Sequence, residues 1–175
     1  MKKSALTIRI SVARQRLTLQ RGRSIEGAFP ISTSRFGLGS EEGSFKTPTG
    51  RFRIAQKIGE GVPINTAFKS RVPVPVSARD LESDDLITSR ILWLDGLEET
   101  NANTYNRYVY IHGTNHEELI GTPASHGCVR MRNEDVAELF ARVEVGTPVV
   151  IIPPRPASAL RAEGEKSVAR KGGPA

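Results

Sequence analysis

Short apolar segments with a period of two, separated by glycine and proline, constrain the fold of this chain more than any other feature. Leu6, Ile8, Ile10 and Val12 alternate with polar residues, the pattern of a strand with one buried face. Further strand-like segments follow at 17–19, 28–31, 51–54, 91–94, 108–111 and 149–152. No regular strand–helix alternation supports a wholly parallel sheet. The sequence therefore predicts a mainly β domain.

One helix is clearly indicated, directly after residue 132. Asn133 is a suitable N-cap, Val136, Leu139 and Phe140 recur at helical spacing, and Gly146 is suited to end the helix. Residues 79–89 are compatible with a second, short polar helix. Residues 59–76 contain three prolines and are expected to form an irregular surface excursion.

Length and composition indicate a single domain with one core. The chain has 175 residues, so we expect a folded domain over residues 1–152 and a disordered, polar, basic tail over 153–175. About half of the net charge of +6 falls in this tail, and the rest is too scattered to predict nucleic-acid binding. The longest aliphatic run, 149–152, is too short to insert into a membrane, and no secretion signal is evident.

The candidate chemistry is concentrated between His112 and Arg130. This stretch reads HGTNHEELIGTPASHGCVR and holds all three histidines and the only cysteine, Cys128. A thiol needs a nearby base to become a nucleophile at neutral pH, which favours a cysteine–histidine pair. Gly113, Gly121 and Gly127 permit a returning loop between the two side chains.

The residues around Cys128 suggest further roles. Gly127 lets its own amide and that of Cys128 converge, as in an oxyanion hole for acyl transfer. Arg130 lies two residues beyond the thiol, where a bidentate contact with a substrate carboxylate is expected.

Two other readings of this stretch remain open on spacing alone. Cys128 could be a buried structural thiol, since free cysteines are often small apolar core residues. Alternatively, His112, His116, His126 and Cys128 could bind zinc, although their spacing matches no standard zinc motif. His116, among Asn115 and two glutamates, is better suited to a solvated loop.

The order of motifs resembles the L,D-transpeptidase catalytic domain. The resemblance rests on HGTN at 112–115 and IGTPASHGCVRM at 120–131, together with TPTGRF at 47–52, WLDG at 93–96 and GTPV at 146–149. It covers roughly residues 6–152. It implies a mostly β single domain with a sandwich-like core of mixed sheets and one or two short helices, in agreement with the strand pattern.

The resemblance also implies roles for individual residues. Cys128 would be the nucleophile and His112 the proton donor and acceptor, while Ser125, His126 and Gly127 would shape the catalytic loop. Arg130, Gly113 and Thr114 are further expected to bind substrate. The family needs no cofactor or metal, so neither is expected.

The implied substrates are peptidoglycan stem peptides. The resemblance implies attack of Cys128 on the carbonyl before a terminal D-alanine, release of D-alanine, and transfer of the acyl group to an amine. An L,D-carboxypeptidase with water as acceptor, and a non-catalytic wall-binding domain, are alternatives. The family is commonly found in the periplasm or cell wall, whereas the missing leader leaves the cytoplasm open. The sequence predicts no oligomeric state.

Overall fold

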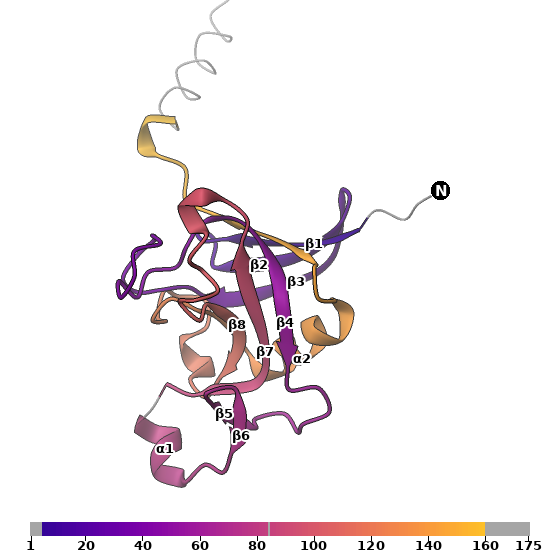
Figure 1. Cartoon of the computed structure of the whole chain (residues 1–175), viewed down its shortest axis with the longest axis vertical. Helices are drawn as coiled ribbons and strands as arrows, with labels where there is room; N and C mark the ends of the chain where they lie inside the picture. The colour runs from indigo at the N-terminus through magenta and orange to yellow at the C-terminus, as the bar shows by residue number, and fades with distance from the viewer. Residues whose placement is uncertain (1–4, 84, 160–175) are drawn as a thin grey trace, which may run out of the picture.

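The computed structural model describes residues 5–83 and 85–159. Within these ranges, ten strands form one mixed sheet in the order β4-β10-β1-β2-β3-β9-β8-β7-β5-β6. Since β4 also pairs with β7, the sheet closes on itself, and only β5 and β6 lie outside the ring (Figure 1). The predicted mainly β single domain with mixed strands and short helices is confirmed. Its facing layers belong to one continuous sheet.

The first three strands form the predicted antiparallel meander: β1 (Leu6–Ser11), β2 (Arg16–Arg21) and β3 (Ser24–Ser32). The closing strand β10 (Pro148–Ile152) lies parallel to β1 and antiparallel to β4 (Gly50–Ile58). Period-two alternation explains why Ile8 and Ile10 are wholly buried, because every second side chain faces the interior of the ring.

Three strands carry the candidate site: β7 (Ile87–Gly96), β8 (Tyr110–Thr114) and β9 (Val129–Met131). β8 is antiparallel to β7 and parallel to β9, and its register places His112 beside Arg130. The strand expected over 108–111 begins and ends later, because residues 112–114 continue the pairing with β7, and His112 therefore lies in the middle of β8.

The main core fills the ring and extends to α2 (Asn133–Arg142). β7 and β8 contribute to it through alternate residues, so that the intervening side chains project to the opposite face of the sheet. The largest fully buried side chains of this core are Phe52, Ile8, Ile10, Leu17, Leu19, Ile31, Ile54, Leu92, Leu94, Ile111 and Met131. Ile91 is equally buried but belongs to a second cluster described below.

The helix α2 occurs where predicted, but Asn133 does not cap it. Asn133 is the first helical residue, and the cap position is Arg132. Glu117 accepts hydrogen bonds from the Asn133 backbone N–H at 2.7 Å and from its Nδ2 at 2.8 Å. Val143, rather than Gly146, follows the last turn. The Asn133 side chain instead joins α2 to the sheet, where the hydroxyls of Thr88 and Ser89 donate to its Oδ1.

The expectation of an irregular excursion holds for residues 59–66 but is wrong beyond them, where β5 (Ala67–Lys69) and β6 (Val72–Val74) form a hairpin. Proline is tolerated in β6, which ends the strand order, since an edge strand has backbone positions without a ladder partner. The short helix α1 (Ala78–Ser83) follows, and the hairpin and α1 lie together at one end of the molecule (Figure 1). Single 3-10 turns occupy Glu99–Asn101 and Glu117–Leu119.

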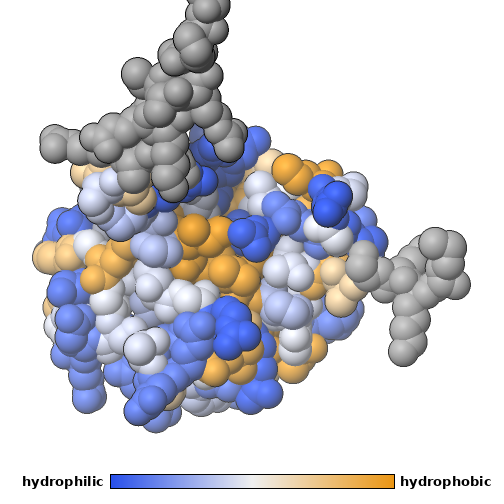
Figure 2. Space-filling model, turned by 90° about the horizontal axis from the view of Figure 1, so that it is seen from above, coloured by the Kyte–Doolittle hydropathy of each residue, from blue (hydrophilic) through white to orange (hydrophobic). Residues whose placement is uncertain are grey.

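The predicted tail is only partly within the described residues. Residues 153–156 are irregular and 157–159 are helical, with the Ala159 amide donating to the Pro156 carbonyl at 3.0 Å, while residues 160–175 lie outside the described range. In the part of the chain that the structure covers, no helix has the length and apolar character needed to cross a membrane. Figure 2 shows a mostly polar face that surrounds a central apolar area.

Replacing Gly113 by alanine should destabilise the fold at the junction of β8 and α2. An added Cβ would lie 2.5 Å from Asn133 Oδ1 and 2.6 Å from the Thr88 carbonyl oxygen. We expect a loss of roughly 1–3 kcal/mol in the free energy of unfolding, measured by urea denaturation. Gly27→Ala is the control, because Gly27 also lies in a strand outside the left-handed region, and the atom nearest to its added Cβ is the flexible end of Arg142 at 3.1 Å. Equal losses in the two variants would contradict the steric explanation.

Candidate active site

Parallel pairing of β8 and β9 brings the predicted nucleophile and base to one face of the sheet. Arg130 lies beside His112, and Cys128 is two residues before Arg130. Tyr110 and His112 point the same way on β8, and Cys128, directly before β9, packs against the cluster that contains Tyr110, so Cys128 and His112 lie toward the same face of the sheet. The Tyr110 amide, two residues before His112, donates a hydrogen bond to Cys128 Sγ at 3.3 Å.

The imidazole of His112 is held in one tautomer. Its Nδ1 lies 2.6 Å from the carbonyl oxygen of Gly113. A carbonyl oxygen only accepts hydrogen bonds, so Nδ1 carries the proton and Nε2 has a free lone pair. Burial lowers the pKa of His112. The hydrogen bond to Gly113 and the charge of Asp85 raise this pKa, whereas the charge of Arg130 lowers it further. The resting imidazole is therefore neutral and able to accept a proton.

The thiol of Cys128 is also neutral at rest. Burial raises its pKa to about 11, the Tyr110 amide opposes the rise, and the Asp85 carboxylate adds to it, while Arg130 and Arg107 oppose it. The sulfur lies 3.5 Å from the Tyr108 carbonyl oxygen, its acceptor in this state. The pair is thus a thiol and a neutral imidazole rather than a preformed ion pair, so a reaction in which Cys128 served as nucleophile would require proton transfer from the thiol.

Ser125 and Gly127 shape the turn that delivers Cys128. The Ser125 hydroxyl donates to the Cys128 carbonyl at 2.6 Å and accepts the Gly127 amide at 3.2 Å. Gly127 has a φ of 122°, a conformation that favours glycine, and its carbonyl accepts a bond from the Thr47 hydroxyl at 2.9 Å. The oxyanion-hole role of the Gly127 amide stays a prediction. In that role the amide would give up its long hydrogen bond to Ser125 and donate to the oxyanion instead.

Asp85 connects two of the predicted site residues and was missed by sequence reasoning. Its Oδ2 accepts hydrogen bonds from Arg130 Nη2 and, at 3.3 Å, from His126 Nδ1. His126 Nε2 in turn lies 3.2 Å from Arg35 Nη2. An acidic stretch before β7 was the only signal in the sequence, and nothing in it indicated which carboxylate would face Arg130.

The residues predicted to bind substrate are engaged with the protein in this structure. Arg130 is 2% exposed, and its Nε is buried with no hydrogen-bond partner among the described residues. Gly113 accepts the His112 bond, and the buried Thr114 hydroxyl accepts the His116 amide at 3.0 Å. Substrate contact by these three residues stays a prediction.

The three histidines have different surroundings. These surroundings bear on the alternative that the histidines and Cys128 bind zinc. His116 Nδ1 lies 3.2 Å from Glu118, and His126 bonds Asp85. Within residues 5–83 and 85–159, no three histidine, cysteine, aspartate or glutamate side chains come together in a way that could hold a metal ion.

An aromatic cluster lies beside the thiol. Cys128 packs against a second hydrophobic cluster that includes Trp93 and Tyr110. The Trp93 ring stacks on Tyr105 at 4.1 Å between centroids and meets Tyr110 edge-on at 5.4 Å. Arg71, at the tip of the β5–β6 hairpin, covers this cluster, with its guanidinium carbon 4.9 Å from the Trp93 centroid. The sequence assigned none of these aromatic residues to the site, and Trp93 was noted only as part of the WLDG motif.

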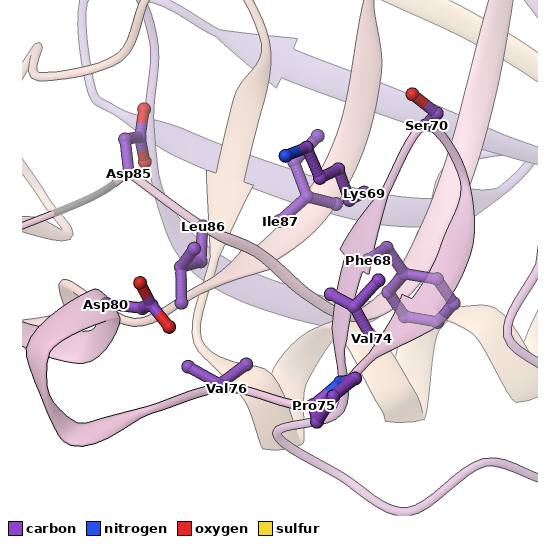
Figure 3. A pocket seen from close by; sticks show the side chains of 10 residues that line it. All are labelled: Phe68, Lys69, Ser70, Val74, Pro75, Val76, Asp80, Asp85, Leu86 and Ile87. Carbon is purple, nitrogen blue, oxygen red and sulfur yellow. The ribbon is translucent and has the colours of Figure 1, made fainter.

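A pocket of about 640 Å³ opens next to the site, between the hairpin, α1 and the start of β7 (Figure 3). Lys69 extends toward its interior, while Asp80 and Asp85 lie on the opposite side. Asp85 therefore belongs both to this pocket and to the hydrogen-bonded group around Arg130. The remaining lining is largely apolar and includes Phe68, Val74, Pro75, Val76, Leu86 and Ile87.

Comparison with known families identifies the domain. The family model of the YkuD-type L,D-transpeptidase catalytic domain matches residues 6–151. The chain belongs to this family. The match agrees with the resemblance drawn from the His-Gly and Ser-His-Gly-Cys motifs, and it covers the whole ring of strands.

Individual L,D-transpeptidases resemble parts of the chain. A putative L,D-transpeptidase of Bacillus subtilis, YqjB, is 50% identical over 48 residues, which is 27% of each chain. A probable L,D-transpeptidase of Escherichia coli, YcfS, is 28% identical over 131 residues, or 75% of this chain and 38% of the relative. The chain therefore matches well under half the length of both relatives.

Solved structures share the fold of this L,D-transpeptidase domain. An L,D-transpeptidase from Mycobacterium smegmatis superposes with a TM-score of 0.55 at 17% identity, over 85% of this chain and 59% of that chain. L,D-transpeptidase 3 from Mycobacterium tuberculosis, with a faropenem-derived adduct, gives 0.55 at 16% identity, over 84% and 60%. At these identities, the likeness concerns the fold alone.

The pH dependence of the alkylation rate of Cys128 should show a raised thiol pKa. Because the thiol titrates at about 11, the rate of reaction with iodoacetamide should rise steeply with pH well beyond about 8.5, the midpoint of an ordinary cysteine. Mass spectrometry of the adduct gives the rate, and Cys128→Ala, which leaves no cysteine, gives the background. A midpoint at or below 8.5 would contradict the neutral thiol.

Replacing Asp85 by asparagine should move the same profile to lower pH. The carboxylate of Asp85 raises the pKa of Cys128, whereas Arg130 lowers it. Without the charge of Asp85, the pKa of Cys128 is no longer raised by a carboxylate but is still lowered by Arg130. Asp95→Asn, which removes a carboxylate paired with Arg53, is the matched control. An unchanged profile in Asp85→Asn would show that Asp85 does not act on the thiol.

Proposed function

We propose that this domain catalyses acyl transfer on peptidoglycan stem peptides through a thioester on Cys128. The proposal is supported mainly by the β8–β9 pairing, in which Tyr110 of the strand that carries His112 donates its amide to Cys128 Sγ, and by the bond of His112 Nδ1 to the Gly113 carbonyl, which leaves Nε2 to accept a proton. The family of the chain supports the same chemistry, because the matched model is a transpeptidase catalytic domain.

The first half-reaction forms the acyl-enzyme. His112 Nε2 accepts the thiol proton as Sγ attacks the carbonyl that precedes a terminal D-alanine. The C–N bond then breaks, and the protonated His112 returns the proton to the departing amine of D-alanine. The amides of Gly127 and Cys128 are proposed to stabilise the negative oxygen of the tetrahedral intermediate.

The second half-reaction releases the acyl group. A side-chain amine of a neighbouring stem attacks the thioester, its proton passes to His112, and the C–S bond breaks with return of the proton to sulfur. The product is a cross-link between two third-position residues. Water in place of the amine would yield the shortened stem peptide and define an L,D-carboxypeptidase.

The charged groups around the pair support proton transfer during the reaction rather than before it. Burial keeps both the thiol and the imidazole neutral, so no charge has to be desolvated in the resting enzyme. As Sγ gives up its proton, the developing negative charge lies near Arg130 and Arg107, whose positive charges favour the thiolate. We propose that Arg130 acts through this field.

Cys128→Ala should abolish both D-alanine release and the covalent adduct, because no other thiol exists in the chain. The purified domain is incubated with a disaccharide-tetrapeptide donor, and the products are weighed by mass spectrometry. Cross-linked dimer indicates a transpeptidase, and tripeptide alone indicates a carboxypeptidase.

A matched control is His116→Ala, because His116 pairs with Glu118 and is not proposed to act in catalysis. An undiminished rate in Cys128→Ala would overturn the proposal. Binding of the donor without any turnover by the wild-type domain would instead favour a wall-binding module.

A further inference from the structure

The tip of the β5–β6 hairpin holds an arginine in an unusual position. Ser70 and Arg71 form its turn with φ values of 49° and 66°, so two successive residues without glycine adopt the left-handed conformation. This tight turn directs the Arg71 side chain back over the sheet, where its guanidinium lies 4.9 Å from the Trp93 ring centroid and 5.2 Å from that of Tyr108. Arg71 Nη1 also donates to the Tyr110 hydroxyl at 3.2 Å.

The residues that hold Arg71 are the ones that surround the nucleophile. The Tyr110 amide donates to Cys128 Sγ, and the Tyr108 carbonyl accepts from it. Trp93 and Tyr110 belong to the cluster against which Cys128 packs. The guanidinium of Arg71 and the side chain of Cys128 therefore contact the same aromatic cluster.

Arg71 has hydrogen-bonding capacity to spare. A guanidinium has five N–H donors in its plane, and stacking on aromatic rings occupies its faces but not its edge. One donor bonds Tyr110, and among the residues that the structure describes no carboxylate pairs with Arg71. By contrast, Arg130, the other arginine considered for substrate carboxylates, is buried and bonded to Asp85.

We infer that Arg71 is a specificity-determining residue that binds the free C-terminal carboxylate of the donor peptide. This inference rests on the proposed function. In a donor that ends in D-alanine, the carboxylate lies one residue beyond the scissile carbonyl, so it must sit close to the sulfur during attack. A forked guanidinium held rigidly by Trp93, Tyr108 and Tyr110 is suited to bind such a group with two parallel hydrogen bonds.

The test compares a tetrapeptide donor that has a free terminal carboxylate with the same peptide as its C-terminal carboxamide. For the wild-type domain, we expect kcat/KM to favour the carboxylate by about 10- to 100-fold, the range of charge-assisted hydrogen bonds. In Arg71→Met this ratio should collapse toward one. Arg71→Lys, which keeps the charge but not the fork, should give an intermediate ratio.

The control is Arg23→Met, which changes an exposed arginine in the β2–β3 turn and should retain the wild-type ratio. A purely structural role of Arg71 in holding the hairpin would slow both donors by the same factor and leave the ratio intact. That result, or a wild-type ratio near one, would overturn the inference while leaving the proposed function in place.

A binding measurement separates failure of the inference from failure of the proposed function. Calorimetry with Cys128→Ala should show tighter binding of the carboxylate peptide than of the carboxamide, and the difference should vanish in Cys128→Ala/Arg71→Met. If the wild-type domain turned over neither donor, the proposed function would fail, and this affinity difference alone would decide the role of Arg71. Equal affinities or no binding would then overturn the inference as well.

Discussion

The parallel pairing of β8 with β9 is the constraint on which the site depends. It joins two segments separated by a loop and sets a register in which His112 lies beside Arg130. In the same arrangement the Tyr110 amide donates a hydrogen bond to Cys128 Sγ. A slip of β9 by one residue would turn Arg130 to the core face and separate it from His112. The opposite face of the same strands carries Ile111, Val129 and Met131, which are wholly buried. Packing of the core thus holds the register that chemistry needs.

The site is neutral where reaction begins and positively charged around it. Burial keeps the imidazole of His112 and the thiol of Cys128 uncharged, while Arg130, Arg107 and Arg71 lie near them. The carboxylate of Asp85 balances part of this charge through Arg130. Such surroundings favour anionic ligands and a negative charge that develops on sulfur or oxygen during the reaction, without stabilising a resting thiolate.

Two departures from expectation explain how the site is assembled. The hairpin β5–β6 forms despite Pro73, because an edge strand tolerates proline, and it brings Arg71 over the aromatic cluster. Asn133 belongs to the helix rather than to its cap, and its side chain joins α2 to β7 through Thr88 and Ser89. Local propensity indicated an irregular segment around Pro73 and a helix cap at Asn133. Pairing of β5 with β6 decided the first, and hydrogen bonds to Glu117 decided the second.

The sequence by itself determined the strand-rich fold and the family, and it predicted the cysteine and histidine of the candidate site. Alternation with a period of two and an ordered motif are local properties that can be read along the chain. Only the tertiary structure decided that Nδ1 of His112 bonds the Gly113 carbonyl, that Asp85 faces Arg130, and that Arg71 lies over Trp93. The physical reason is that hydrogen bonding, burial and ring contacts depend on side chains that meet across the sheet, and one sequence carries no local signal for such pairs.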